Sequence, residues 1–421
     1  MTTHYTLDGK KISLLGYGAM RLPTTDGKHA VPWQKEGYSD KAIDQELLNR
    51  QVKMLLDGGV TYFDTSPAYC RGESEAALGK ALKASGYARK DYVVATKLSN
   101  LAPQQYPLAA CKKMFEDSLK FLQTDYIDNY LLHSIGNGGF KTFSRRYLEN
   151  GALDWCAELR AKGRIRRLGF SYHGDPKAFE WCIARHGTYK WDFVQIQMNY
   201  VDWRHASGNN VNAEYLYAEL EKRHIPAIIM EPLLGGRLSN VPDHIAATLK
   251  QQAPESSVAS WAFRFAGSHA DVLTVLSGMT YMEHLQDNLR TYSPLDTLTE
   301  ADLEFLEETA QLMLRYPTIP CNDCKYCMPC PYGLDIPAIL LHYNKCINEG
   351  NVPASSQDEN YRKARRAFLI GYDRSVPKLR QANHCIGCGQ CVSHCPQSIN
   401  IPKELHRIDR FVEELKQGKE F

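Results

Sequence analysis

Eight of the thirteen cysteines in this 421-residue chain stand in two short runs near its C-terminal end. The runs consist of Cys321, Cys324, Cys327 and Cys330, and of Cys385, Cys388, Cys391 and Cys395. Closely spaced thiolates are soft ligands that hold iron–sulfur clusters or zinc. The two runs therefore predict metal chemistry in this part of the chain.

The second run has the spacing C-x2-C-x2-C-x3-C and is followed by Pro396, which is the pattern of bacterial ferredoxins. In that pattern three thiolates bind one [4Fe–4S] cluster and the fourth binds the neighbouring cluster. We expect two clusters, held by Cys321, Cys324, Cys327 with Cys395, and by Cys385, Cys388, Cys391 with Cys330. The first run departs from the pattern at Cys330, which follows Cys327 after two residues rather than three.

Zinc and disulfides are the alternatives for these cysteines. A zinc ribbon needs four ligands and would leave the other four cysteines without a role. Disulfides need an oxidising compartment, and the first residues, MTTHYTLDGK, lack the apolar stretch of a secretory signal. We therefore expect a cytoplasmic protein. The other five cysteines are expected to be packing residues, with a redox-sensitive thiol as the alternative for the first of them: Cys70, Cys111, Cys156, Cys182 and Cys346.

Composition excludes several partners. Fifty Lys and Arg residues against 48 Asp and Glu give a formal charge of +2, without the basic excess of a nucleic-acid binder. The apolar runs are too short to span a bilayer. The sequence predicts a globular protein that binds neither nucleic acid nor a membrane.

Upstream of the cysteine runs, strand-like and helix-like segments alternate. Eight strands are expected, at Ile12–Leu15, Val60–Thr65, Tyr92–Thr96, Tyr126–Leu132, Ile165–Phe170, Phe193–Met198, Ile225–Met230 and Val272–Leu276. Alternation of this kind predicts a parallel sheet, and eight repeats favour a (β/α)8 TIM barrel of the α/β class. An open doubly wound sheet is the alternative, but no G-x-G-x-x-G follows a strand.

Two domains follow from this division. Residues 1–296 are expected to form the barrel and residues 297–421 a small α-helical ferredoxin-like domain, joined by a helix at Glu300–Leu314. Between the cysteine runs, Pro337–Cys346 and Asn360–Ile370 have apolar residues at helical spacing.

Reactive residues of a barrel lie at the carboxyl ends of its strands. Asp64 lies at the end of the second expected strand, Lys97 follows the third and His133 the fourth, and Tyr69 stands five residues after Asp64. The four side chains are therefore expected to meet on one rim.

These residues belong to segments that resemble the aldo-keto reductase family. The segments are Gly59–Tyr69, Ser74–Gly79, Val94–Lys97 and Tyr126–His133, and the resemblance extends over roughly residues 10–295. The tail is similar to that of the iron–sulfur subgroup of this family, in which a ferredoxin-like domain follows the barrel.

The resemblance implies an NAD(P)-dependent oxidoreductase acting on a small-molecule carbonyl or alcohol. Tyr69 would be the acid, Lys97 would stabilise its phenolate and Asp64 would keep Lys97 charged. His133 would orient the substrate oxygen by a hydrogen bond.

The resemblance also implies contacts to the cofactor. They would come from Gly18, Met20, Ser171, Gln195, Pro232, Leu233, Gly235, Ser277, Gly278, His284 and Asn288. The sequence departs from the family by lacking a basic residue for a 2′-phosphate after the eighth strand, and by having Tyr172 where an Asn is usual. Either NADP(H) or NAD(H) is therefore expected, and no flavin-binding motif is recognisable.

Long loops after strands set substrate choice without a readable code. Arg145, Arg146, Trp203 and Arg204 lie in such loops, where charges are expected to be solvated. His173 is either a pocket residue or a solvated loop residue. The clusters would serve structure or exchange electrons with a redox partner protein. A non-catalytic sensor of redox state, iron or nicotinamide on the same folds is the alternative function.

Overall fold

The computed structural model describes residues 1–27, 42–207, 210–314, 318–353, 355–395, 397 and 399–418. The chain divides into two compact units. The first, called the barrel unit, comprises Met1–Leu233 and Ala259–Leu303, and the second, called the cysteine unit, comprises Leu234–Val258 and Glu304–Phe421. Each unit is described by itself.

Eight parallel strands form a closed barrel in the order β10-β3-β4-β5-β6-β7-β8-β9. They are β3 (Leu15–Gly18), β4 (Tyr62–Asp64), β5 (Val93–Leu98), β6 (Ile127–Ile135), β7 (Ile165–Tyr172), β8 (Phe193–Gln197), β9 (Ala227–Met230) and β10 (Val272–Ser277). The expected (β/α)8 fold is confirmed.

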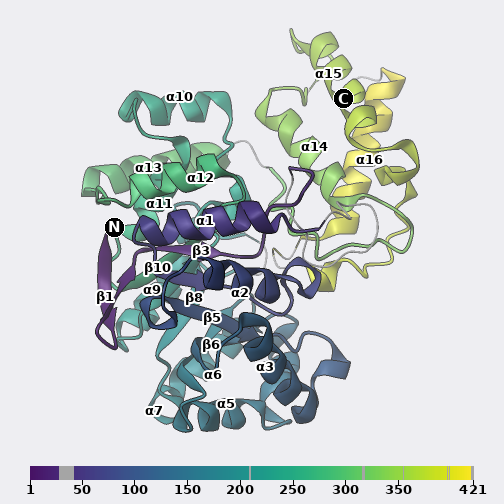
Figure 1. Ribbon diagram of the computed structural model, residues 1–421. Helices are drawn as coiled ribbons and strands as arrows, with labels where there is room; N and C mark the ends of the chain where they lie inside the picture. The colour runs from purple at the N-terminus through teal and green to yellow at the C-terminus, as the bar shows by residue number, and fades with distance from the viewer. Residues whose placement is uncertain are drawn as a thin grey trace. The chain divides into compact units, whose positions relative to one another are not determined.

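Helices follow the strands and lie on the outside of the barrel (Figure 1). The helices of this part of the chain are α1 (Gln45–Asp57), α2 (Ser74–Ala84), α3 (Leu108–Leu122), α4 (Gly139–Phe143), α5 (Ala152–Ala161), α6 (Pro176–Ala184), α7 (His186–Tyr189), α8 (Asp202–His205), α9 (Ala213–Glu221), α11 (Val258–Gly267) and α12 (Met282–Thr291). Their starts are fixed by local chemistry. The side chain of Asp44 caps α1 at the amide of Leu47, and Asp175 caps α6 at Lys177.

The first expected strand, Ile12–Leu15, is wrong in its boundaries. The chain there forms the end of a hairpin strand, β2 (Lys10–Ser13), and then the first barrel strand, β3. Buried residues run through both strands without a break, so the apolar pattern does not reveal where the chain changes from one sheet to the other.

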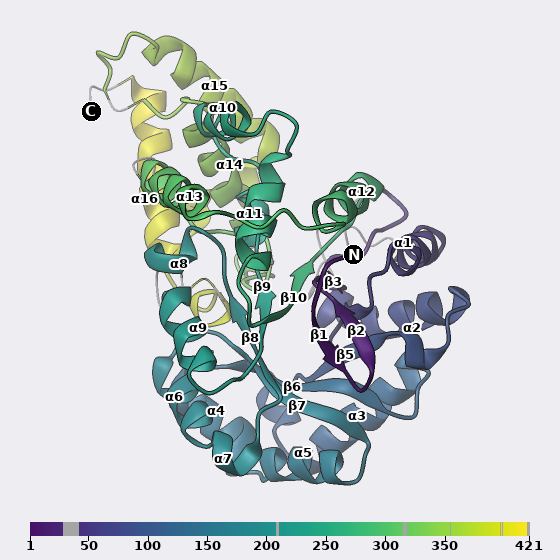
Figure 2. The same ribbon diagram turned by 90° about the vertical axis from the view of Figure 1, so that its left-hand side faces the viewer.

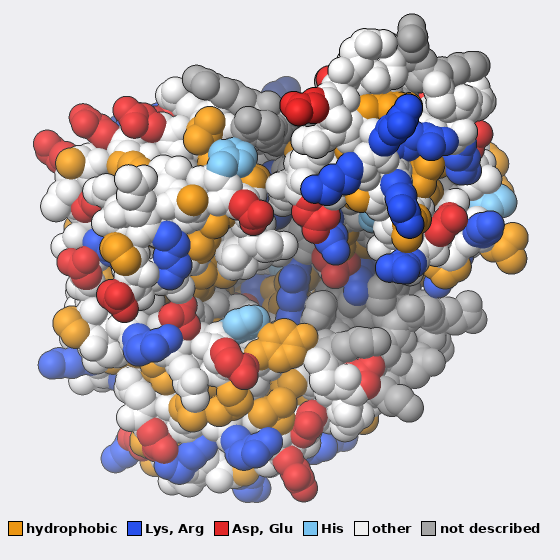
Figure 3. Space-filling model, turned by 90° about the horizontal axis from the view of Figure 1, so that it is seen from above, with side chains coloured by type: hydrophobic (Ala, Val, Ile, Leu, Met, Phe, Trp, Pro, Cys, Tyr) orange, Lys and Arg blue, Asp and Glu red, His pale blue; other side chains and the backbone are white. Residues whose placement is uncertain are grey.

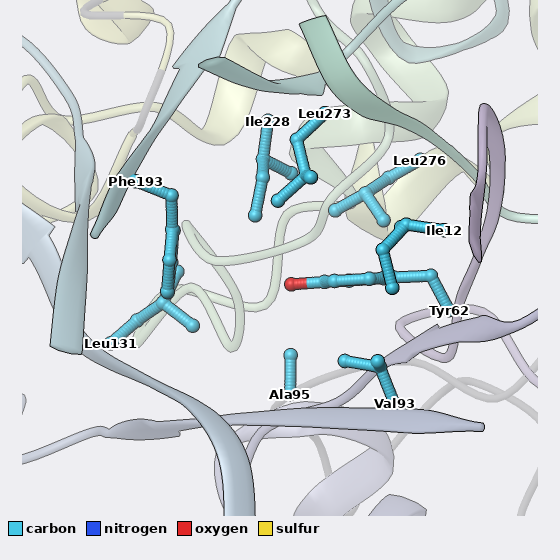
Figure 4. Close-up of a cluster of buried hydrophobic side chains, with 9 residues drawn as sticks. All are labelled: Ile12, Tyr62, Val93, Ala95, Leu131, Phe193, Ile228, Leu273 and Leu276. Atoms are coloured by element: carbon cyan, nitrogen blue, oxygen red, sulfur yellow. The ribbon is translucent and has the colours of Figure 1, made fainter. Parts of the chain in front are cut away.

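Strands β1 (Thr3–Leu7) and β2 form a hairpin that covers the amino end of the barrel (Figure 2). Tyr5 and Leu7 pack against a buried cluster drawn in Figure 4, which consists of Ile12, Tyr62, Val93, Ala95, Leu131, Phe193, Ile228, Leu273 and Leu276. Apolar filling of this end leaves the carboxyl ends of the strands as the place for polar chemistry.

The cysteine unit is helical. Its helices are α10 (Asp243–Gln252), the greater part of α13 (Glu300–Leu314), α14 (Ile336–Asn348), α15 (Tyr361–Ser375) and α16 (Ile401–Gln417). Helix α16 buries Ile401, Leu405, Ile408, Val412 and Leu415 along one face, and Phe411 meets Phe368 of α15 edge to face at 5.0 Å. Among the described residues, no helix is both long and apolar enough to cross a membrane.

Candidate functional site

Three of the four expected catalytic residues are placed by neighbouring barrel strands. Asp64 is the last residue of β4, while Lys97 and His133 lie near the ends of β5 and β6. Lys97 and His133 lie within their strands rather than after them, because β5 and β6 extend further than the apolar pattern suggests. Since β4, β5 and β6 are adjacent, the three side chains reach the same rim.

Asp64 and Lys97 form a buried ion pair. The Lys97 Nζ donates to Asp64 Oδ1 at 2.5 Å and to the carbonyl oxygen of Thr65 at 2.8 Å. Burial lowers the pKa of Lys97 and raises that of Asp64, and in both cases the partner charge opposes the effect of burial. Each group thus depends on the other to keep its charge inside the barrel.

Tyr69 reaches the pair from the turn between β4 and α2. The Lys97 Nζ lies 4.8 Å from the centroid of the Tyr69 ring, and the edge of this ring meets His133 at 6.0 Å between centroids. The next two residues, Cys70 and Arg71, have φ values of 49° and 57°, which are strained for residues with side chains. Local strain thus accompanies the placement of Tyr69.

His133 is held neutral and oriented. Ser99 Oγ lies 2.6 Å from its Nδ1, and Ser66 Oγ lies 2.8 Å from Ser99 Oγ. Burial lowers the pKa of His133 well below its usual value, and the charges of Lys97 and Arg146 lower it further. In the neutral ring one nitrogen carries the proton, and the contact with Ser99 at Nδ1 decides which tautomer faces the rim.

Arg146 was expected to be a solvated loop charge, and this expectation is wrong. Its side chain is 2% exposed. The guanidinium donates to the carbonyl oxygens of Asn100, His133 and Ser134 and to Tyr147 Oη. No carboxylate pairs with it within the described part of the chain. The segment after β6 is helical, and it places the Arg146 guanidinium against the backbone of His133. The sequence predicts a loop there and therefore does not reveal this contact.

Four of the expected cofactor residues come together where β10 meets β3. The Asn288 side chain donates to Ser277 Oγ at 3.0 Å. A Cβ atom at Gly18 would lie 3.5 Å from the Ser277 carbonyl oxygen, and one at Gly278 would lie 3.8 Å from that of Gly18. The backbones at Gly18 and Gly278 thus lie in van der Waals contact at this point of the rim.

Two more expected cofactor residues line the inside of the rim. Ser171 Oγ accepts from the amide of Ser134, which leaves its hydroxyl proton available for another acceptor. Gln195 Oε1 is buried without a hydrogen-bond partner within the described residues. An unpaired buried acceptor is costly, so it is suited to receive an N–H group from a ligand.

The remaining cofactor residues lie in different surroundings. Met20, Pro232 and Leu233 belong to segments after β3 and β9. His284 is an exposed residue of α12 whose ring meets that of Tyr281 edge to face. Gly235 belongs to the cysteine unit. A Cβ atom there would lie 1.9 Å from the Cβ of Asn322, so the absence of a side chain lets these two segments pack.

The eight cysteines of the two runs form two neighbouring groups. A pocket in the cysteine unit is lined by Cys321, Cys324, Cys327 and Cys395, with Leu340, Ile399 and Ile401 among its apolar walls. Burial raises the pKa of the Cys327 thiol, and Cys324, Cys321 and Cys395 add to the rise. A cysteine from the second run thus stands with three from the first.

The second group contains the other four cysteines. Burial raises the pKa of Cys391 to about 11, and the nearby thiols of Cys385, Cys388 and Cys330 add to the rise. Among the described residues, no three Cys, His, Asp or Glu side chains form a site for a single metal ion. The five other cysteines are buried, and burial raises the pKa of Cys70 to about 12, which leaves its thiol protonated.

Comparison with known proteins agrees with these observations. The model of the aldo/keto reductase family matches residues 14–310, and that of a 4Fe-4S dicluster domain matches residues 320–400. L-galactose dehydrogenase of Arabidopsis thaliana is 26% identical over 322 residues, covering 72% of this chain and 92% of that protein.

Solved structures share the barrel fold. An aldo-keto reductase from Bacillus halodurans in its holo form superposes with a TM-score of 0.56 and 22% identity, over 73% of this chain and 95% of the other. An aldo-keto reductase from Klebsiella pneumoniae in complex with NADPH gives 0.52 and 21%, over 73% and 95%.

Proposed function

The chain belongs to the aldo/keto reductase family, and from this premise we propose that it is an NAD(P)H-dependent oxidoreductase. Its reaction would transfer a hydride between a nicotinamide and a small-molecule carbonyl or alcohol. The observation that carries the proposal is the buried array in which Asp64 contacts Lys97, Lys97 faces Tyr69, and Tyr69 contacts His133.

A bound nicotinamide would supply or accept the hydride. When a carbonyl is reduced, its oxygen gains negative charge, and Tyr69 would donate its phenolic proton to this oxygen. The ammonium group of Lys97 lies 4.8 Å from the Tyr69 ring and would stabilise the phenolate that remains. Asp64 would hold Lys97 in place and offset its charge through the 2.5 Å contact.

His133 would hold the substrate oxygen. Because it is neutral, its Nε2–H donates a hydrogen bond without competing with Tyr69 as the acid. Ser99 would keep the ring in this tautomer through its contact with Nδ1. Arg146 would position His133, because its guanidinium donates to the backbone carbonyl of His133. Its charge also lowers the pKa of the His133 ring and so helps to keep the ring uncharged.

The residues around the rim fit a nicotinamide. The unpartnered Oε1 of Gln195 would accept from the carboxamide N–H group, and the hydroxyl of Ser171 would donate to its oxygen. Gly18, Ser277 and Gly278, which lie together beside Asn288, would border the cofactor at this point of the rim. The barrel of the Klebsiella pneumoniae neighbour, crystallised with NADPH, supports this choice of cofactor.

The cysteine unit would hold two [4Fe–4S] clusters with crossed ligands. The family match over residues 320–400 and the pocket that brings Cys395 to Cys321, Cys324 and Cys327 support this assignment. A hydride carries two electrons while such a cluster passes one at a time, so a pair of clusters matches the electron count of one hydride.

Turnover by anaerobically purified protein tests the proposal. We expect oxidation of NADPH or NADH with at least part of a panel of aldehydes and ketones, and formation of the matching alcohols. Binding of nicotinamide without turnover of any member of the panel would instead support a sensor. Iron and acid-labile sulfide, measured on the same sample, report separately on the clusters.

A further inference from the structure

The two cysteine groups differ in how far they reach the surface. In the first group, Cys321 and Cys324 are each 8% exposed and the other two are partly exposed. In the second group none is buried, and Cys388 is exposed. Electron transfer between proteins requires that the redox centre come close to its partner. The second group is therefore the one that an outside protein can approach.

Exposed apolar side chains surround this second group. Leu379 is 81% exposed, Ile386 62%, Tyr332 48% and Val392 37%. Two hydrogen bonds connect the segments of Leu379 and Tyr332 to the cysteines: the Arg380 side chain donates through Nε to the carbonyl of Gly333, and the amide of Gly333 donates to the carbonyl of Cys330. Exposed apolar residues gathered around one feature indicate an interaction site.

The same stretch of chain is strongly basic. Residues 361–395 contain seven Lys or Arg and a single Asp, although the whole chain carries only +2. Four of the cations line an open groove on α15, namely Arg362, Lys363, Arg366 and Arg374. Figure 3 shows the molecule from above, which is the side where α15 lies in Figure 1. Lys and Arg side chains gather at the upper right of this view.

These cations are also unpaired. None of the four that line the groove, nor Lys378 beyond it, forms a side-chain hydrogen bond or an ion pair within the described residues. On the barrel unit, by contrast, Arg160, Arg164 and Arg204 bind Asp192, Glu116 and Glu214. Unpaired surface cations attract an acidic partner and steer its approach.

We propose that α15 and the exposed loop around the second cysteine group form the docking surface for an acidic one-electron carrier protein. This inference rests on the proposed function, because it requires the clusters to be present. One electron would pass from the reduced carrier to the oxidised cluster held by Cys385, Cys388, Cys391 and Cys330, leaving the carrier oxidised by one electron. The unpaired cations would bind the rim of the carrier, and Leu379 and Ile386 would pack at its centre.

Binding to an acidic [2Fe–2S] ferredoxin tests the surface. The full chain, purified anaerobically, is compared with Arg366→Glu/Arg374→Glu, and with Lys80→Glu/Lys83→Glu as a matched control. Lys80 and Lys83 are exposed residues of α2 in the barrel unit. Arg366→Gln/Arg374→Gln removes the two charges without reversing them, so it is a second, milder test if the Glu variant does not fold.

We expect the α15 reversal to raise the Kd for the ferredoxin at least about tenfold in low salt, the Gln variant to have a smaller effect, and the control to stay within about twofold. Salt of roughly 0.5 M should remove the differences. In stopped-flow measurements, ferredoxin should reduce the clusters of the α15 variant more slowly, while dithionite reduces all variants alike.

Absence of ferredoxin binding to the unmodified protein, or equal losses in the α15 and control variants, would overturn the proposal. So would tighter binding of a single-stranded oligonucleotide that depends on the same arginines. Aldehyde turnover on the same samples distinguishes failure of the docking proposal from failure of the proposed function. Turnover without ferredoxin binding rejects only the docking surface, and ferredoxin binding without turnover rejects only the proposed reductase activity.

Discussion

The barrel rim and the cysteine groups are assembled in opposite ways. At the rim the protein supplies both members of a buried ion pair, so Lys97 meets Asp64 at 2.5 Å without any added group. In the cysteine unit, the eight clustered thiols lie in two groups with raised pKa values at Cys327 and Cys391. The proposed ligands would become thiolates only when iron offsets their charge. Folding alone completes the ion pair at the barrel rim, whereas the proposed cluster sites in the cysteine unit would be complete only with iron and sulfide.

The two sites should therefore fail independently. Loss of a rim side chain should stop the chemistry and leave the clusters in place. Loss of a cysteine should remove iron and leave the rim intact.

Tyr69→Phe is expected to lower kcat/KM for an aldehyde by about 10²–10⁴, the range typical of a lost general acid. Nicotinamide affinity and iron content should stay unchanged. Tyr130→Phe is the matched control, since the Tyr130 hydroxyl is buried in β6 and has no partner among the described residues. Equal losses in both variants, measured by steady-state kinetics, would show that packing rather than proton transfer is at stake.

Arg146→Met is expected to destabilise the barrel unit by about 3 kcal/mol, because three buried carbonyl oxygens each lose a donor. It should also raise the pKa of His133, since the Arg146 charge lowers it. The acid limb of the pH–rate profile should therefore move to higher pH. Arg145→Met is the control, because Arg145 is exposed. A profile unchanged by Arg146→Met would reduce Arg146 to a structural role.

Cys327→Ser is expected to lower bound iron by about half, because only the cluster of the first group loses a ligand. Aldehyde turnover should persist. Cys346→Ser serves as the comparison, since Cys346 is buried in α14 outside both groups. Iron and sulfide analysis of both variants would contradict the assignment of Cys327 as a cluster ligand if Cys346→Ser lost as much iron as Cys327→Ser.

Low pH is expected to reduce the free energy of unfolding of the barrel unit, because buried histidines resist protonation. Burial lowers the pKa of His173 to about 4, whereas in the unfolded chain it is about 6.5. Between these values the unfolded state binds a proton that the folded state does not, so stability falls as the pH drops from 6.5 to 4. Glu75 opposes this, because burial raises its pKa to about 7.

His173→Asn should flatten that fall. Urea midpoints at pH 7.5, 6 and 5 measure it, and comparison with the parent chain cancels any loss of clusters in acid. Identical pH dependence in the two proteins would show that His173 titrates normally in the folded state.

The sequence predicts the barrel well because each strand is a short buried apolar run and each helix follows from spacing. It fails where the same apolar pattern serves two elements. At Leu14 the run passes from the hairpin to the barrel without a signal, and at His133 the strand continues because its residues are buried on both faces. Both errors come from burial that periodicity alone does not distinguish.

The candidate site divides in the same way. Asp64, Tyr69, Lys97 and His133 could be predicted because strand ends of a barrel converge. Arg146 could not, because its burial depends on how the helical segment after β6 folds back onto the carbonyls of Asn100 and His133. Ser99 was also missed, since a serine after a strand has no distinctive pattern until His133 is placed beside it.

The decisive measurement is the transfer of deuterium to the product from NADPH or NADH in which both hydrogens at C4 of the nicotinamide are deuterium. With the unmodified protein and an aldehyde substrate, mass spectrometry should find the label on the carbinol carbon of the alcohol, and Cys327→Ser should give the same result. Tyr69→Phe should form almost no labelled product. Product without label from the unmodified protein, or label transfer that depends on Cys327 rather than on Tyr69, would contradict hydride transfer at the barrel rim.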